Sequence, residues 1–301
     1  MMASDNTKKH AARAASVHAR LLNRAKRDGK DFSHTLVRYG LERWIYRLSI
    51  SPIRDRFLLK GALLFDLWFD IPHRSTHDAD FLAYGSPGTD AMRDTIRSIC
   101  RIDADDGMSY DPDTVIIGEI RKGSVYAGLR ATLTGFLGRT RCPVQIDIGF
   151  GDAVTPGPDE ADFPTLLPDL PAPRLKVYPR ETAIAEKVDA LLKMGMANSR
   201  MKDYFDLWTL FSHYTFDPAV LGRAIAATAG RRDTAITVSP IGLSDEFGND
   251  PVKRTQWAAF LKKNLLQAES LDVIVAELRE WLSPALENAR KELAERAKKT
   301  T

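Results

Sequence analysis

Patterns typical of strands and of helices occupy different parts of this chain, and this segregation restricts its fold more than any other feature. The segments that predict strands all lie between residues 79 and 149, at 79–84, 114–121, 125–134 and 143–149. From residue 181 onward, apolar residues recur three and four apart and predict helices at about 181–196, 201–213, 217–228, 251–266 and 270–298. Such segregation favours an α+β fold with a mixed sheet over an alternating parallel-sheet fold.

The remaining segments complete a division into three parts. Helical patterns are expected at 1–30, 33–48 and 88–100, a turn that opens a helix at 60–69, and a hairpin at residues 122–124. Residues 151–179 hold seven prolines and predict an extended crossing segment. We therefore expect a basic helical segment (1–55), a sheet domain (56–179) and a helical domain (180–301).

Composition excludes several classes of protein. Of 301 residues, 44% are hydrophobic and 28% charged, which rules out a disordered chain or a collagen-like polymer. The two cysteines, Cys100 and Cys142, have no metal-ligand spacing and cannot form a disulfide framework. No window approaches the roughly 18 apolar residues of a membrane span, and the first residues lack the apolar core of a secretory signal. We expect a cytoplasmic protein without membrane contact.

Charge is unevenly distributed along the chain. Residues 1–56 hold 13 Lys/Arg against 5 Asp/Glu, a net charge of +8, whereas residues 57–150 hold 10 against 13, a net charge of −3. This asymmetry could mark a surface for a polyanion beside a metal-binding centre. A solvated arm beside an ordinary surface explains the counts at least as well.

Three aspartates on two predicted strands form the main candidate site. Asp78 and Asp80 are two residues apart, so on a strand they project to the same face. Asp147 alternates with Ile146 and Ile148 and can face the polar side of the same sheet. Neighbouring carboxylates repel unless a cation lies between them, and oxygen ligands suit Mg²⁺. One or two such ions would stabilise the attacking and leaving oxygens of a phosphoryl or nucleotidyl displacement.

A glycine turn precedes the acidic pair. Gly61 follows a short apolar stretch and Lys60, and such a turn brings backbone N–H groups close to a phosphate. Each piece alone is a weak indicator, since an Asp-x-Asp pair more often marks a turn or a hydrated strand edge. The informative feature is the order: a glycine turn, a helix, paired aspartates on one strand, then a single aspartate on a later strand.

That order resembles the DNA polymerase beta-like nucleotidyltransferases. Two later segments, 181–191 and 198–207, look like the signature of the AbiEii/AbiGii-type toxin nucleotidyltransferases, a group that includes the MenT toxins of type IV toxin–antitoxin and abortive-infection systems. The similarity covers about residues 57–212. One departure is Ala62, which stands where the family commonly has a second glycine followed by a hydroxyl residue, so nucleotide contacts there would depend on backbone N–H groups and Lys60.

The resemblance implies a set of site residues. Asp78, Asp80 and Asp147 would be metal ligands and, with Lys187 and Asp203, the catalytic group. The residues implied in nucleotide binding are Lys60, Gly61, Ala62, Arg74, Thr76, Lys187, Arg200 and Lys202. Structural roles compete at three positions: Lys187 can extend from the flank of an apolar helix stripe to solvent, Asp203 can pair with a helix N-terminus, and Thr76 can be a turn hydroxyl or a modification site.

These features lead to the hypothesis of a Mg²⁺-dependent nucleotidyltransferase toxin. It would transfer NMP from an NTP to an RNA acceptor, by resemblance the 3′ end of tRNA, and so block translation; a separately encoded antitoxin is expected. Two alternatives stay open. The same fold could modify a protein side chain or a small molecule, or it could bind RNA or a partner without catalysis.

Overall fold

The computed structural model describes residues 2–69, 76–85, 88–120 and 128–300. Within these ranges the chain contains one mixed sheet and ten α-helices, which confirms the α+β class. The chain divides into two compact units, one of residues 1–151 and 159–177 and the other of residues 152–158 and 178–301. The expected basic segment, 1–55, thus lies in the first unit together with the sheet. The expected hairpin turn at 122–124 lies outside the described residues.

The sheet has seven strands among the described residues, in the order β3-β4-β5-β2-β1-β7-β6. Their bounds are β1 (Phe57–Lys60), β2 (Asp78–Ala83), β3 (Met108–Ile120), β4 (Gly128–Leu137), β5 (Thr140–Phe150), β6 (Asp159–Asp162) and β7 (Arg174–Val177). Strand β2 pairs in parallel with β5, and β1 pairs in parallel with β7, whereas the other neighbours are antiparallel. This arrangement puts β2 in the middle of the sheet, between β1 and β5.

The proline-rich segment contributes two strands that its sequence did not predict. Strand β7 extends the sheet beyond β1, and its Leu175 and Val177 are both 3% exposed. Its four residues lie between Pro173 and Pro179, so the run is too short for a periodic signal. The expected extended conformation is therefore found at 159–162 and 174–177, which are strands of the sheet, whereas residues 152–158 group with the second unit.

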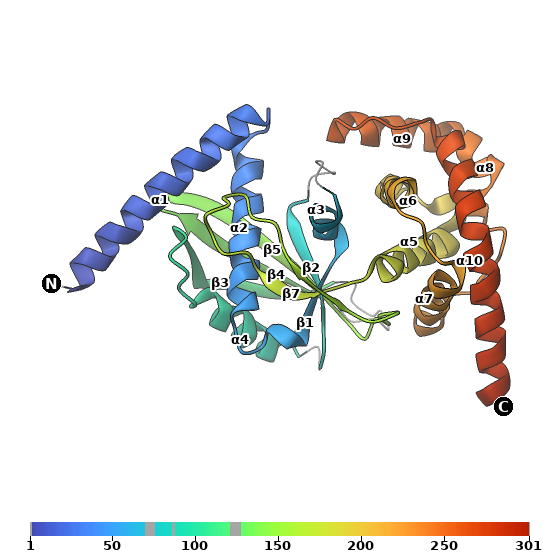
Figure 1. Ribbon diagram of the computed structural model, residues 1–301, viewed down its shortest axis with the longest axis horizontal. Coiled ribbons are helices and arrows are strands. Elements are labelled where there is room, and N and C mark those ends of the chain that lie inside the picture. The colour runs from blue at the N-terminus through green and yellow to red at the C-terminus, as the bar shows by residue number, and fades with distance from the viewer. Residues whose placement is uncertain (1, 70–75, 86–87, 121–127, 301) are drawn as a thin grey trace. The chain divides into compact units, whose positions relative to one another are not determined.

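Helices cover one face of the sheet. The helices of the first unit are α1 (Met2–Arg27), α2 (Phe32–Ser49), α3 (Leu64–Trp68) and α4 (Thr89–Cys100). Helix α2 runs across the strands and contacts both β5 and α4 (Figure 1). Its Trp44 packs against Phe81 of β2, with ring centroids 6.1 Å apart, and both side chains are fully buried. Alternate residues of β2, Asp78 and Asp80, consequently project from the opposite, polar face.

A buried ionic cluster joins α2 to the loop before β3. Arg47 Nη1 and Arg43 Nε lie 2.7 and 2.9 Å from Asp106 Oδ2, and all three side chains are buried. Burial alone would raise the pKa of Asp106, but the hydrogen bonds from Arg47 and Arg43 outweigh it and hold the pKa below its usual value. Two of the basic residues in the first 56 are therefore internal, and the charge count of that segment overstates the surface it offers to a polyanion.

The second unit is helical. Its helices are α5 (Arg180–Met194), α6 (Met201–His213), α7 (Pro218–Arg231), α8 (Asp245–Asn249), α9 (Pro251–Asn264) and α10 (Leu271–Thr300). The segment between α7 and α9 packs on α6 through two contacts: Tyr204 Oη donates to the Gly242 carbonyl at 2.9 Å, and the rings of Tyr204 and Phe247 stack at 5.0 Å. Within the described part of the chain, none of the helices is both long enough and apolar enough to span a bilayer.

Candidate functional site

Two of the three predicted aspartates stand opposite one another on adjacent strands. In the parallel register of β2 and β5, Asp80 is the partner of Asp147, and Asp78 is the partner of Gln145. Neighbouring strands lie about 4.8 Å apart, so the backbone brings Asp80 and Asp147 within reach of one ion. The alternation that exposes them follows from burial of Ala79 and Ile146, both 0% exposed, on the other face.

The pairing extends into a row across four strands. Lys60 of β1 is the register partner of Asp80, and Arg130 of β4 is the partner of Asp147. We call Lys60, Asp80, Asp147 and Arg130 the carboxylate row. Arg130 donates from Nε to Asp147 Oδ1 at 2.8 Å and from Nη2 to Oδ2 at 2.6 Å, a bidentate pair. These hydrogen bonds raise the pKa of the Arg130 guanidinium, and attraction by Asp147, Asp78 and Asp80 adds to the effect.

A second row lies beside the first on the same face. Asp78, Gln145, Thr132 and Ile116 are successive register partners across β2, β5, β4 and β3, and we call them the amide row. The Gln145 amide links the rows, because Nε2 lies 3.4 Å from Asp78 Oδ2 and 3.5 Å from Asp147 Oδ1. Just before β2, Thr76 Oγ1 donates to Asp78 Oδ1 at 2.5 Å and so orients that carboxylate.

Gly61 directly follows β1 and lies against Asp80. Its φ of +74° falls in the left-handed region, and a Cβ added there would lie 2.7 Å from Cγ and 2.8 Å from Cβ of Asp80. The turn therefore requires glycine for both its conformation and its closeness to the carboxylate. The helix that follows is short, a 3₁₀ turn over 61–63 and then α3, and Ala62 is buried at 8% exposure. Only the backbone of Ala62 can take part in binding.

The residues fit a magnesium ion in type and in backbone placement. Asp78, Asp80 and Asp147 supply carboxylate oxygens from one face of adjacent strands, the ligands that Mg²⁺ prefers. Their side chains do not form a ready cage, since no group of three potential ligands is close enough among the residues described here. Arg130 binds both oxygens of Asp147, so coordination by Asp147 requires that this pair opens.

The predicted residues of the second half form a separate cluster within the helical unit. Lys187 Nζ of α5 lies 2.5 Å from Asp206 Oδ2 and 3.5 Å from Asp203 Oδ1. Arg200 Nε lies 2.5 Å from Asp203 Oδ2. Both carboxylates are at most 1% exposed, Lys187 is 13% exposed, and Lys202 is exposed. This cluster is at least a structural ion network, and it contains Asp206, which the sequence analysis did not select.

One predicted site residue is not described by the structure, and two residues of the site were not selected from the sequence. Arg74, predicted to bind nucleotide, lies outside the described residues. Arg130 and Gln145 were not selected from the sequence, although both occupy polar positions of alternating strands. An arginine at such a position is ordinarily a solvated surface charge, and only the register with β5 shows that it faces an aspartate.

Comparison with known proteins gives a family and two structural resemblances. The family model for the nucleotidyl transferase AbiEii toxin of the type IV toxin–antitoxin system matches residues 43–290. The crystal structure of JHP933 from Helicobacter pylori is 16% identical with a TM-score of 0.45, covering 88% of this chain and 96% of that one. A candidate nucleotidyltransferase from the same species is 17% identical with a TM-score of 0.43, covering 85% and 94%. No curated protein matches the chain.

Proposed function

We propose a specific activity from the premise that this chain belongs to the AbiEii nucleotidyl transferase toxin family of type IV toxin–antitoxin systems. Membership makes it a nucleotidyltransferase with an NTP substrate and a separate antitoxin as partner. We propose that the enzyme depends on Mg²⁺ and has the polymerase beta-like arrangement of sheet and helical bundle. It would transfer NMP from the NTP to RNA, with the tRNA 3′ end as acceptor. This modification would stop translation in the cytoplasm. The register of Asp80 with Asp147, beside Asp78, is the observation that best supports this proposal.

The proposed chemistry assigns different tasks to the three aspartates. Asp78 and Asp80 would hold the metal, which would neutralise charge on the triphosphate, and Asp147 would complete its ligand set. Asp147 would orient the acceptor hydroxyl and accept its proton. The hydroxyl oxygen forms a bond to the α-phosphorus, the bond from that phosphorus to the bridging oxygen breaks, and pyrophosphate leaves with the electron pair. Catalysis of this kind is mostly positioning and electrostatic stabilisation.

Lys60 and Gly61 suit the polyphosphate. Gly61 has no side chain to obstruct its N–H, and Lys60 adds a positive charge beside Asp80 in the carboxylate row. Thr76 would act through Asp78, which it orients. We also propose nucleotide contacts for Ala62, through its backbone alone, and for Arg74.

For the helical unit we propose that Lys187 carries positive charge to the nucleotide phosphates and that Asp203 belongs to the catalytic group. Arg200 and Lys202 would add phosphate contacts. The ion pairs support a fixed orientation of Lys187, since Asp203 and Asp206 hold its ammonium on one side of α6.

Transfer of label from NTP tests the activity. Purified protein is incubated with each labelled NTP, Mg²⁺ and total tRNA, and in parallel with protein or small-molecule acceptors. We expect label on tRNA, and Asp80→Asn should lose more than the ~10–100-fold that loss of an outer-shell partner costs. Asp94→Asn, an exposed aspartate of α4, is the matched control and should retain full activity. Label only on another acceptor would refute the tRNA proposal, and full activity of Asp80→Asn would refute the site.

Growth provides a second, independent measurement. Expression of the protein alone should slow cells, and Asp80→Ala should relieve the effect while Asp94→Ala does not. Equal toxicity of Asp80→Ala and wild type would contradict the proposed mechanism. If Mg²⁺–NTP produced no heat of binding in isothermal titration with the wild type, the result would favour the alternative of a non-catalytic protein that binds RNA or a partner.

A further inference from the structure

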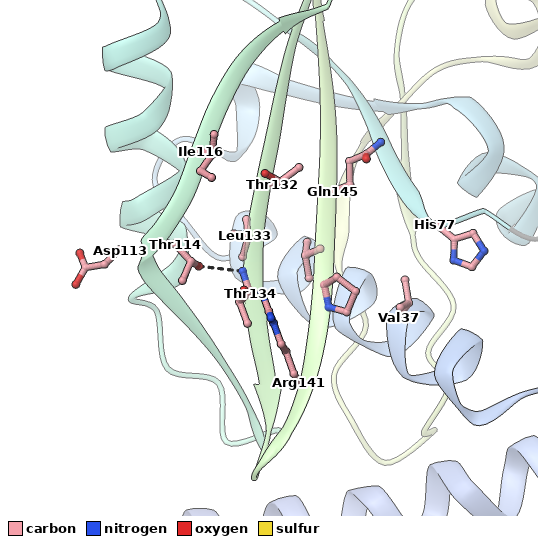
Figure 2. Close-up of a pocket in the computed structure, with 12 residues that line it drawn as sticks. Val37, His77, Asp113, Thr114, Ile116, Thr132, Leu133, Thr134, Arg141 and Gln145 are labelled. Carbon is pink, nitrogen blue, oxygen red and sulfur yellow. Dashed lines mark hydrogen bonds between the residues drawn. The ribbon is translucent and has the colours of Figure 1, made fainter.

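A groove of about 810 Å³ lies on the polar face of the sheet, directly beside the carboxylates (Figure 2). Its volume is within the roughly 300–1,000 Å³ typical of ligand sites. Strands β3, β4 and β5 supply Ile116, Thr132 and Gln145 to it, which are three of the four members of the amide row. The groove therefore runs along a row of side chains that ends at Asp78.

Gln145 makes the groove continuous with the proposed catalytic centre. Its amide lines the groove and also lies within hydrogen-bond distance of Asp78 and Asp147. A hydroxyl group seated beside Gln145 is therefore a close neighbour of the carboxylate that we propose as its proton acceptor. Arg130 holds both oxygens of Asp147, so the hydroxyl reaches this carboxylate when that pair opens.

The two sides of the aspartates differ in chemistry. On the β1 side are Gly61, which has no side chain, and Lys60, and both suit the charged triphosphate. On the β5 side is the groove, because the strands are ordered β3-β4-β5-β2-β1. If the triphosphate occupies the β1 side, in-line attack requires the acceptor to approach from the other side. This step rests on the proposed function.

The side chains of the groove suit a nucleoside rather than a polyphosphate. Thr132 and Gln145 offer neutral hydrogen-bonding groups, and Ile116 offers an apolar surface that is 69% exposed. The carboxylate of Asp113 also lines the groove, but it points away from Thr132 and Gln145 (Figure 2). One guanidinium, Arg141, lies at the end of the groove away from the aspartates, where its Nη2 donates to Thr134 Oγ1 at 3.2 Å. This combination matches a sugar and base followed by a single phosphodiester.

We propose that this groove binds the terminal nucleosides of a single-stranded RNA acceptor and presents the terminal hydroxyl to Asp147. The base would lie against Ile116 and hydrogen-bond to Thr132 and Gln145. Arg141 would contact the backbone phosphate that precedes the terminal nucleosides. Binding in this groove determines which acceptors the enzyme can modify, whereas the β1 side determines nucleotide binding.

Charge placed in the groove tests the proposal without touching the aspartates. Ile116→Glu puts a carboxylate three strands away from Asp78, at a position already exposed to solvent. We expect the KM for RNA and the Kd of a 5′-labelled RNA, measured by fluorescence anisotropy without NTP, to rise at least tenfold. Heat of Mg²⁺–NTP binding should not change. Ile116→Gln has nearly the same shape as Ile116→Glu but no charge, so it loses only the apolar contact to the base and should weaken RNA binding less than Ile116→Glu does. Ser98→Glu, on the exposed side of α4, is the matched control and should change nothing.

Salt dependence tests the phosphate contact. Arg141→Gln should lower the magnitude of the slope of log Kd against log salt by about 0.7, the value for one phosphate contact on a single strand. Arg101→Gln, exposed at the end of α4, should leave the slope unchanged. An unchanged slope for Arg141→Gln would refute its assigned contact.

The outcomes separate the groove from the activity. If wild type labels RNA and Ile116→Glu leaves RNA binding unchanged, the groove assignment is refuted and the nucleotidyltransferase proposal stands. If wild type labels a protein instead of RNA, the RNA occupant is wrong. If wild type labels no acceptor, the proposed function fails, and the anisotropy measurement still decides whether the groove binds RNA.

Discussion

Replacing Gly61 by alanine should disturb the site through a contact that can be measured separately from backbone strain. At φ +74° an L-residue costs ~1–2 kcal/mol. A reduction of unfolded-state entropy offsets ~0.4–1 kcal/mol of that cost. The backbone alone should therefore lower the free energy of unfolding by about 1 kcal/mol.

The second contribution comes from Asp80. A Cβ at position 61 would lie 2.7–2.8 Å from Asp80 Cγ and Cβ, below the 3.0 Å that real Cβ contacts respect. The backbone of Asp80 is fixed by pairing with β1 and β5, so its side chain or the turn must move. Overpacking of this kind costs ~1–3 kcal/mol. Gly61→Ala should thus lose about 2–4 kcal/mol in total, and it should displace a proposed metal ligand.

Gly29→Ala isolates the backbone contribution. Gly29 has a φ of +62° and nothing within 4 Å of an added Cβ. Urea denaturation should show that the free energy of unfolding falls by at least ~1 kcal/mol more in Gly61→Ala than in Gly29→Ala. Only Gly61→Ala should lose nucleotidyl transfer and the binding of Mn²⁺, which takes the place of Mg²⁺ in the measurement. If the two variants are equally stable and Gly61→Ala retains transfer, Gly61 is not required for its closeness to Asp80.

Three further predictions concern other parts of the first unit. Asp106→Asn should cost ~3–5 kcal/mol in urea denaturation, because two buried arginines lose their counter-charge. The pKa of Asp106 is lower in the folded protein than its ordinary value of 3.8, so the wild type should lose stability as the pH falls below 3.8 and passes through the folded pKa. Asp106→Asn should lack this pH-dependent loss. Equal acid sensitivity of the two proteins would contradict the prediction. Arg130→Gln should change the unfolding free energy by less than about 1 kcal/mol, because Arg130 is 46% exposed. Mn²⁺ titrated without nucleotide should nevertheless bind more tightly, because Asp147 is released from Arg130. Weaker Mn²⁺ binding in paramagnetic resonance would refute the competition between Arg130 and the metal for Asp147. Burial raises the pKa of Cys100 to about 11 and of Cys142 to about 12, so iodoacetamide at pH 8 should label both thiols only after unfolding.

The faces of the strands could be predicted from the sequence, but their register could not. Alternation around Asp80 and Asp147 identifies the polar side of each strand, because the residues on either side of each aspartate are apolar and buried. The parallel pairing of β2 with β5 joins residues 67 positions apart, and a slip of one residue would turn Asp147 to the buried face. Only this register identifies Arg130 as a partner of Asp147, since nothing in its local sequence distinguishes it from a surface charge.

The cluster around Asp106 shows the opposite limit. Arg43 and Arg47 are four residues apart on a helix, a spacing that puts both on one face. Their partner lies about 60 residues later in an irregular loop, and it draws both guanidiniums into the interior. Charge counts along a sequence therefore measure surface charge only where no such distant partner exists.

Lys187 requires a test that separates catalysis from packing. Asp206 is fully buried and its ammonium partner lies 2.5 Å away, so Lys187→Met alone leaves a buried charge without its closest counter-ion and should cost ~3–5 kcal/mol. Lost activity in that variant would then say nothing about a role in transfer. The double variant Lys187→Met/Asp206→Leu removes both charges together, and replacement of a buried pair by apolar residues is often neutral.

The double variant should consequently regain most of the lost stability in urea denaturation. If Lys187 contacts nucleotide phosphates, the double variant should be stable but still show low nucleotidyl transfer and weak Mg²⁺–NTP binding in calorimetry. Recovery of transfer together with stability would show that Lys187 acts only as the counter-ion of α6. Asp203 loses its 3.5 Å contact with Lys187 in both variants alike and keeps its ion pair with Arg200, so the difference between the two variants reports on Asp206 alone.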